Sequence, residues 1–482
     1  MRLKFFSHLI LMVLLNLLVK PIAIFGIDAQ VQNVVGPQEY GIYFSLLNFT
    51  YLFNILLDFG ITNFNIKYIA HYPHLAKQYI GKIIPLRFFL LFIYVCITII
   101  IGLVLGYDEK QYKILSFLIF NQFLISVILF FRSYFSGLLL LKTDIILSVL
   151  DKFLLIIVMG YLLYFQKDIE ITVQKFVEIQ TLTLLLTCLI ALVLIFIKIG
   201  FPSIKWNFSF NRLIIKKSFP YALLIVLMMI YNRIDSVMLE RMMPRWSHET
   251  GIYAQAFRLL DAFFMFASLF SGLLFPIFSK MLKKKQNINH LLDSASSILF
   301  SGAIILVVIC FFNAEFLMNL FYKNEIHTSS FVFQYLIISF IPICITLIFG
   351  TLLTANGNLS FLSKLSFFGI LLNILLNWFL IPKYGALGTT VASLITQSCV
   401  AIAHLFFTFK LFKIKFEMRE FLNYTGFIFT VCVSGYILKE YVNNYLQIGF
   451  IFLISIIYLL ITNMFQWKLI LNVLKQRNNT EN

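Results

Sequence analysis

The chain has 482 residues, of which 61% are hydrophobic, 17% aromatic and only 12% charged. Because soluble domains carry about 25% charged residues, this composition excludes an ordinary soluble protein and indicates a chain embedded in lipid. The formal net charge of +17 comes without any RNP-like, Cys/His or basic-helix motif, so we assign it to anionic lipid at the membrane surface and not to nucleic acid.

About fourteen apolar segments follow one another, each near the ~20 residues that a helix needs to cross a bilayer. They lie at approximately 8–27, 41–64, 84–106, 113–138, 144–165, 176–197, 218–240, 251–279, 293–320, 328–355, 361–381, 385–409, 422–438 and 446–466. The gaps are short, so no soluble catalytic domain is expected. The pattern predicts an all-α polytopic membrane protein with about 14 transmembrane helices.

Basic residues are concentrated in alternate gaps, with 25 of the 38 Lys and Arg on one side and 9 on the other. Since cytoplasmic loops are enriched in Lys and Arg, this bias predicts that both termini are cytoplasmic. The first apolar run follows Arg2 and Lys4, as in a signal peptide. It is too long, contains Lys20 and lacks a small-residue cleavage site, so we interpret it as the first span.

The longest interruption, Lys198 to Lys217, separates two halves of six spans each. The tripeptide Gly-Ile-Tyr opens the second span at Gly41 and the eighth span at Gly251, which indicates an internal duplication. Halves with an even number of spans share their orientation, so they are expected to be related by an axis along the membrane normal. The expected domains are an N-terminal six-helix lobe (1–200), a cytoplasmic linker (201–217), a C-terminal six-helix lobe (218–410) and two additional helices with a cytoplasmic tail (411–482).

Four basic residues remain inside the apolar spans when those near the span ends, Arg87 among them, are counted with the gaps. An ionisable side chain is costly there and suggests a function. They are Lys20, Lys152, Arg233 and Arg258. At ~1.5 Å per residue, Lys20 is ~18 Å from the inner end of span 1, Arg233 ~24 Å along span 7, and Arg258 ~10 Å deep in span 8 from outside. These three are expected to form a cationic layer in the outer half of the bilayer, on the wall of an anion-binding cavity. The alternative is that each cation pairs with a nearby carboxylate or carbonyl and locks helices, with Lys20 reaching outward along its stem.

Two carboxylates accompany the arginines. Arg233 and Asp235 are two residues apart, hence about 200° apart around the helix, so they are not expected to neutralise each other. Arg258 and Asp261 are three apart and lie on one face, where they can pair. Both carboxylates are included in the predicted substrate site.

Other polar residues inside spans are interpreted mainly as packing contacts. Asp144 and Asp151 share a face of span 5, with Lys152 adjacent, and predict an intrahelical or interlobe salt bridge. Asn373 and Asn377 share a face of span 11 and are typical of hydrogen bonds between membrane helices.

Asp58, in the sequence Leu57-Asp58-Phe59-Gly60, approaches the cytoplasmic end of span 2. We interpret it as a helix-end partner of Lys67 or as a contact of a cytoplasmic gate, with a role in substrate binding as the weaker reading.

Nothing in the sequence supports catalysis or a cofactor. There is no Walker loop and no Gly-x-Ser-x-Gly motif. The seven histidines are scattered, and all six cysteines lie inside apolar segments, so neither a metal site nor a disulfide is expected.

Several motifs at the span ends resemble those of a known family. Gly36 to Tyr43 (GPQEYGIY) is similar to its Gly-Pro-x-x-Tyr-Gly-x-Tyr, and Asp58 to Gly60 is similar to its Asp-x-Gly. Pro382 to Ala392 (PKYGALGTTVA) resembles its Pro-x-Tyr-Gly-x-x-Gly-(small)-(small)-x-Ala, and Gly251 to Ala256 matches the start of its span 8. By these motifs the chain resembles the polysaccharide flippases of the multidrug/oligosaccharidyl-lipid/polysaccharide exporter superfamily.

The resemblance implies two six-helix lobes around a central cavity lined largely by spans 1, 2, 7 and 8. It also implies a lipid-tail groove formed by the two C-terminal helices, as in the related peptidoglycan-precursor flippases. The cavity spans carry the residues already singled out, which gives the predicted substrate-binding set: Lys20, Arg233, Asp235, Arg258 and Asp261.

The implied function is to move an oligosaccharide on a polyprenyl diphosphate from the inner to the outer leaflet of the bacterial cytoplasmic membrane, for assembly of O-antigen or capsule. The implied partners are this lipid-linked substrate and membrane lipids, with a polysaccharide polymerase and a coupling cation as further candidates. No enzymatic step is expected.

Two alternatives stay open. A multidrug/cation antiporter of the same superfamily would favour an acidic cavity, whereas three of the singled-out residues are basic. An O-antigen polymerase or ligase would need a sizeable loop outside the membrane, whereas the gaps here are short.

Overall fold

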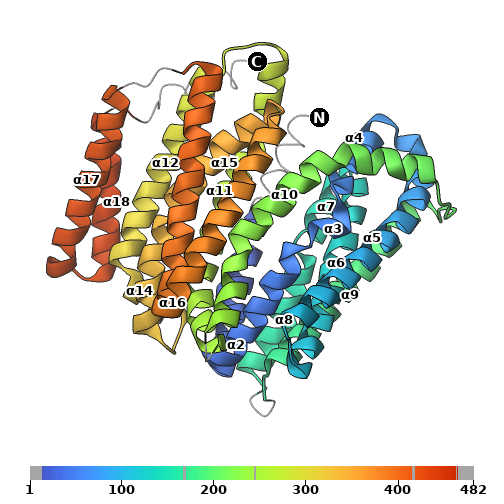
Figure 1. Ribbon diagram of the computed structural model, residues 1–482, viewed down its shortest axis with the longest axis horizontal. Helices are drawn as coiled ribbons and strands as arrows, with labels where there is room; N and C mark the ends of the chain where they lie inside the picture. Colours follow the sequence, from blue (N-terminus) through green and yellow to red (C-terminus); the bar gives the residue numbers. More distant parts are fainter. Residues whose placement is uncertain (1–13, 167–169, 244–245, 415–417, 463, 465–482) are drawn as a thin grey trace. The chain divides into compact units, whose positions relative to one another are not determined.

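The computed structural model describes residues 14–166, 170–243, 246–414, 418–462 and 464. Both termini, predicted to be cytoplasmic, lie outside the described residues. Within those ranges every element is helical (Figure 1). The elements are η1 (Ile22–Asp28), α2 (Ala29–Leu52), α3 (Ile55–Asp58), α4 (Ile61–His71), η2 (Pro73–Leu75), α5 (Ala76–Val104), α6 (Glu109–Gly137), α7 (Leu141–Leu147), α8 (Leu150–Tyr164), α9 (Val173–Ile199), α10 (Phe208–Met242), α11 (Trp246–Lys283), α12 (Asn289–Phe312), α13 (Ala314–Phe321), α14 (Ile326–Ile338), α15 (Phe340–Ala355), α16 (Leu359–Phe412), α17 (Met418–Tyr441) and α18 (Asn444–Ile461).

In the described part of the chain, 12 helices are long and apolar enough to cross a membrane. Two of them, Leu14–Leu52 with 39 residues and Leu359–Phe412 with 54, exceed what one crossing needs. At 1.5 Å per residue they are ~58 and ~81 Å long, against a hydrocarbon core of ~30 Å, so each can contribute to two crossings. Twelve helices therefore accommodate the predicted fourteen spans, and the expected all-α polytopic class is confirmed.

A single glycine interrupts each of the two long helices. Gly36 has φ 83° and ψ 164°, and Gly385 has φ 53° and ψ −127°. A side chain disfavours such angles, so only glycine adopts them at little cost. Residues 36–40, expected as a loop, are helical except at Gly36. Near Gly385 the chain doubles back, since a Cβ on Gly388 would overlap the carbonyl of Leu380.

The contacts divide the chain into two units. The first comprises Met1–Gln255, Phe321–Glu325 and Ile370–Thr389. In it α6 packs along α9, as Figure 1 also shows, and α10 packs along α2. Its core joins Phe131, Tyr134 and Phe135 of α6 to neighbouring side chains of α5 and α9.

The second unit comprises Ala256–Leu320, Ile326–Gly369 and Thr390–Asn482. Its centre is α12, which contacts α14, α15, α17 and α18. Val308 of α12, Phe427 and Val431 of α17, and Ile451 of α18 share one buried cluster. The boundaries at 200, 217 and 410 stay predictions.

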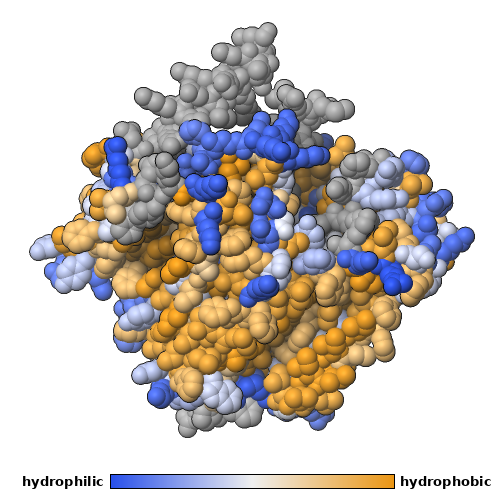
Figure 2. All heavy atoms as spheres, turned by 45° about the horizontal axis from the view of Figure 1, so that its top comes forward, coloured by the Kyte–Doolittle hydropathy of each residue, from blue (hydrophilic) through white to orange (hydrophobic). Residues whose placement is uncertain are grey.

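Many large apolar side chains face outward from these helices. Phe92 is 66% exposed, Val104 82% and Tyr436 65%, whereas polar residues such as Asn373 and Thr389 are fully buried. Figure 2 shows one face on which hydrophobic side chains cover a broad area, with hydrophilic ones gathered above and below it. This distribution suits a protein whose surface meets lipid, because apolar side chains cost nothing in hydrocarbon and backbone polar groups are satisfied inside helices.

Candidate functional site

Two lysines meet near the middle of a span in the first unit. Lys152 lies near the start of α8, and α7 and α8 together form the candidate span Leu141–Tyr164. Its Nζ is 3.4 Å from Oδ2 of Asp151, and its side chain is 39% exposed. Lys20 lies within electrostatic range of Arg132, Asp151 and Lys152. Two cations thus share one carboxylate at a depth where charges are costly.

Tyr51 and Asp28 also lie within electrostatic range of Lys152. Tyr51 comes from the end of α2, and Asp28 from the end of η1, where it is 8% exposed. The cluster therefore gathers side chains from three separate stretches of the first unit.

Arg233 approaches the same tyrosine from α10. Its guanidinium carbon is 5.6 Å from the centroid of the Tyr51 ring. Its Nη1 donates to Oδ1 of Asn48 at 3.3 Å, and the amide nitrogen of Asn48 donates to the carbonyl of Phe44 at 2.9 Å. That second bond orients the Asn48 oxygen toward Arg233. Tyr51 thus lies beside Arg233 and within electrostatic range of Lys152.

Asp235 lies in a different environment from Arg233. Its Oδ1 accepts from the amide nitrogens of Asn373 at 2.9 Å and Asn377 at 2.7 Å, and Tyr253 donates to Oδ2 at 3.4 Å. All four side chains are at most 2% exposed. The two asparagines, expected to join helices, connect α16 to α10 through this carboxylate.

The oxygens of this cluster are of the types that bind small cations. Carboxylate and amide oxygens are the ligand types of hard cations, and Oδ1 of Asn377 is buried without a hydrogen bond. Among the described residues, no group of three or more His, Cys, Asp or Glu side chains is placed to hold a metal ion.

Arg258 and Asp261 belong to the second unit, on α11. Both are partly exposed, one helical turn apart. The prediction that Arg258 shares a cavity with Lys20 and Arg233 stays a prediction.

Asp58 lies where the second predicted span is interrupted between α3 and α4. It ends α3 and is followed by Phe59 (φ 49°) and Gly60 (φ 78°), both left-handed. Oδ1 of Asp58 accepts from Nη2 of Arg87 at 2.5 Å and from the backbone nitrogen of Thr62 at 3.2 Å, and the Thr62 hydroxyl also donates to it. The carboxylate therefore caps α4 and ties it to α5.

The Arg87 side chain is buried, although its sequence position groups it with the loop cations. It is 5% exposed and lies within the candidate span Pro73–Val104. Nη1 donates to the hydroxyl of Ser126 at 2.8 Å and to its carbonyl at 3.1 Å, and the guanidinium carbon is 4.4 Å from the Phe130 ring centroid. The partner of Asp58 is thus a distant arginine, whereas the expected partner, Lys67, has a side chain outside the described ones.

A second buried network holds the end of α10. Glu240, 1% exposed, pairs with Arg241 at 2.8 Å and accepts from Gln111 at 2.8 Å. Arg241 donates to the Gln111 side-chain oxygen at 2.9 Å and covers the Tyr107 ring at 4.2 Å. Burial, assisted by Glu240 and opposed by Arg241, raises the pKa of Tyr107 well above its usual range. The network anchors α10 to α6.

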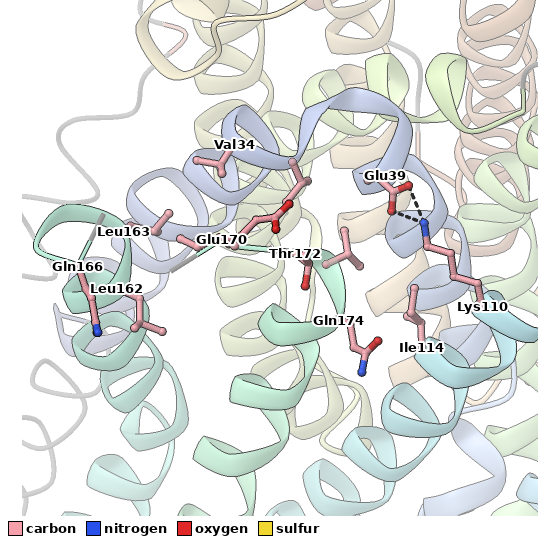
Figure 3. Close-up of a pocket in the computed structure, with 13 residues that line it drawn as sticks. Val34, Glu39, Lys110, Ile114, Leu162, Leu163, Gln166, Glu170, Thr172 and Gln174 are labelled. Carbon is pink, nitrogen blue, oxygen red and sulfur yellow. Dashed lines mark hydrogen bonds and ion pairs between the residues drawn. The ribbon is translucent and has the colours of Figure 1, made fainter. Parts of the chain in front are cut away.

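The first unit also holds a cavity of about 700 Å³ between the end of α8 and the start of α9, shown in Figure 3. Its wall includes Glu39 of α2 and Lys110 of α6, whose side chains pair at 2.7 and 2.8 Å. Both are well exposed, so the pair contributes at most about 1 kcal/mol. None of the predicted site residues lines this cavity.

A family described as "Polysaccharide biosynthesis protein" matches residues 7–282. The chain belongs to this family. The resemblance inferred from the motifs is thereby confirmed. The chain is also 28% identical over 200 residues to an uncharacterized membrane protein, MJ1375 of Methanocaldococcus jannaschii. That match covers 41% of this chain and 46% of the other, so it spans about half of that relative.

Two solved transporters share the fold of this polysaccharide biosynthesis protein. Lipid II flippase MurJ in an inward closed conformation has a TM-score of 0.71 at 15% identity, covering 96% of this chain and all of that one. An inward-facing multidrug resistance MATE family transporter of the MOP superfamily has a TM-score of 0.64 at 14% identity, covering 82% and 94%. At these identities the similarity concerns the fold alone.

Lys152, Asn48 and Tyr51, which lie around Lys20 and Arg233, were not predicted as site residues. Lys152 carried a signal, since it is a cation inside an apolar span, but its neighbour Asp151 favoured a structural salt bridge. Asn48 and Tyr51 carried no signal, because polar residues of these types are common in membrane helices. Their relevance follows only from the contacts with Arg233.

Proposed function

We propose that this member of the polysaccharide biosynthesis family is a flippase for an oligosaccharide linked to a polyprenyl diphosphate. It moves the head group from the inner to the outer leaflet of the bacterial cytoplasmic membrane, for assembly of surface polysaccharide such as O-antigen or capsule. The two termini are on the cytoplasmic side in this proposal.

The observation that carries the proposal is the grouping of Lys20, Lys152 and Arg233 in the middle of apolar helices. All three are partly exposed on the first unit. Cations placed so deep are costly unless they meet an anion, and a diphosphate head group is such an anion. Arg258 is kept in the proposal as the further substrate ligand that the sequence predicts.

The transport needs no chemical step in this proposal. The protein lowers the desolvation barrier for the sugar and the diphosphate, while the lipid tail stays in hydrocarbon. An inside-negative potential favours outward movement by ~2.3 kcal/mol per charge per 100 mV. The oxygens around Asp235 are suited to hold a coupling cation, and a polysaccharide polymerase would take up the product.

The test is to locate the lipid-linked oligosaccharide in cells that lack the gene. Loss of a flippase should leave single repeat units in the inner leaflet, whereas loss of a polymerase or ligase should leave them in the outer leaflet. Accessibility to a lectin added to sealed spheroplasts distinguishes the two. Outer-leaflet accumulation would refute the proposal.

The second candidate function is a multidrug/cation antiporter. It is favoured by the buried Asp235 carboxylate and by the fold shared with a multidrug resistance transporter. In that case the gene should change resistance to cationic drugs and leave the surface polysaccharide intact.

A further inference from the structure

Besides the Glu240–Arg241 pair at the end of α10, three ion pairs lie inside apolar spans among the described residues of the first unit. One of these three differs from the other two. Arg87 and Asp58 are 2.5 Å apart, with side chains 6% and 27% exposed. Arg132 and Asp144 are 2.7 Å apart, with side chains 18% and 10% exposed. Distances this short are those of charge-assisted hydrogen bonds, so both pairs are closed.

The third pair, Lys152 and Asp151, is open. The charged atoms are 3.4 Å apart, and the lysine side chain is 39% exposed. A lysine ammonium on a flexible stem exchanges partners more readily than the rigid fork of an arginine.

Asp151 does not depend on Lys152 alone for its stability. It lies in the first turn of α8, where the helix dipole stabilises a negative charge, and Lys20 is also within electrostatic range. The lysine can therefore leave without stranding the carboxylate.

We propose that Lys152 is a further ligand of the substrate diphosphate, and that Asp151 is an internal anion that occupies Lys152 until the diphosphate arrives. The proposal rests on the flippase function. Lys152 is within electrostatic range of Lys20 and of Tyr51, the ring beside Arg233. In the empty site, Asp151 neutralises Lys152 and so lowers the free-energy cost of a charge in lipid. When the diphosphate is bound, Asp151 competes with it for Lys152. This competition weakens substrate binding and favours release after transport.

The experiment measures binding of farnesyl diphosphate and of uncharged farnesol to the full chain in nanodiscs. Asp151→Asn should bind the diphosphate about tenfold more tightly, and Lys152→Gln about tenfold more weakly, each a change of about 1.4 kcal/mol. Lys152→Arg should stay close to the unchanged protein. The double variant Asp151→Asn/Lys152→Gln should match Lys152→Gln, because the gain requires the lysine. Farnesol binding should be the same throughout.

Asp144→Asn is the matched control, since it removes one charge from the neighbouring closed pair. An equal gain in that variant would mean that net charge alone is responsible and would overturn the inference. The inference would also be overturned if the double variant still bound the diphosphate more tightly than the unchanged protein. It would be overturned as well if Asp151→Asn bound the diphosphate no more tightly than the unchanged protein. If the pair is merely structural, both single variants should bind the diphosphate more weakly and unfold at a lower temperature. If Lys152→Gln does not fold, the diphosphate affinities of Asp151→Asn and Lys152→Arg still test the inference.

Binding by the unchanged protein distinguishes a failure of the Lys152 inference from a failure of the flippase function. If it prefers the diphosphate over farnesol while the variants do not differ, the inference fails and the flippase function stands. If it shows no preference, the anion-binding function itself is refuted and the inference falls with it.

Discussion

Replacing Arg87 by methionine removes the cation from a buried network and leaves its partner behind. Arg87 donates to Asp58, Thr62 and Ser126 and stacks on Phe130. Breaking a buried pair by removing one partner costs about 3–5 kcal/mol, because the remaining charge stays desolvated. Asp58 is 27% exposed and keeps its bonds to Thr62, so we expect the lower end of that range.

The matched variants are Asp58→Asn and the double variant Asp58→Asn/Arg87→Met. Replacing both charges by neutral groups often restores stability, so the double variant should be more stable than Arg87→Met alone. Unfolding by denaturant in detergent micelles measures the three differences. An Arg87→Met variant that loses less than about 1 kcal/mol would refute the reasoning, since the pair would then behave like a surface salt bridge.

Transport by the double variant separates the two readings of Asp58. If Asp58 only holds α4 against α5, a stable double variant should export glycan. If Asp58 is a gate contact, export should stop although the protein is folded.

The remaining predictions concern the site, the topology and one glycine. Arg233→Ala and Arg258→Ala should abolish glycan export while the protein stays in the membrane, and lysine at either position should retain partial export if charge alone matters; normal export by both alanine variants would support a packing role. Cysteine at Gln38 should react with an impermeant reagent only from outside, and cysteine at Gln286 only from inside; the opposite pattern would overturn the assigned orientation. Gly251→Ala should destabilise the protein by about 1–3 kcal/mol, because its Cβ would overlap the backbone of the chain segment at the start of the second span; an unchanged unfolding midpoint would contradict that packing.

The fold class, an all-α membrane protein, could be predicted from the composition of the chain and the succession of its apolar segments alone. Insertion into lipid depends on the apolar content of each ~20-residue window, which is a local property. For the same reason the ion-bearing spans were recognisable, and Lys20, Lys152, Arg233 and Arg258 stood out as cations in apolar runs. The family followed from short motifs at the span ends, and Gly36 and Gly385 within them mark the two helix breaks.

The partners of these charges were decided only by the tertiary structure. Asp58 lies nine residues from Lys67, yet its bonded arginine is 29 residues away, and the asparagines that hold Asp235 are 138 and 142 residues away. In hydrocarbon a polar side chain must find a partner inside the protein, and which partner it finds depends on the helix that packs against it. Spacing along one helix therefore identifies which residues need a partner. The packing of α10 along α2 determines that Arg233 lies beside Asn48 and Tyr51.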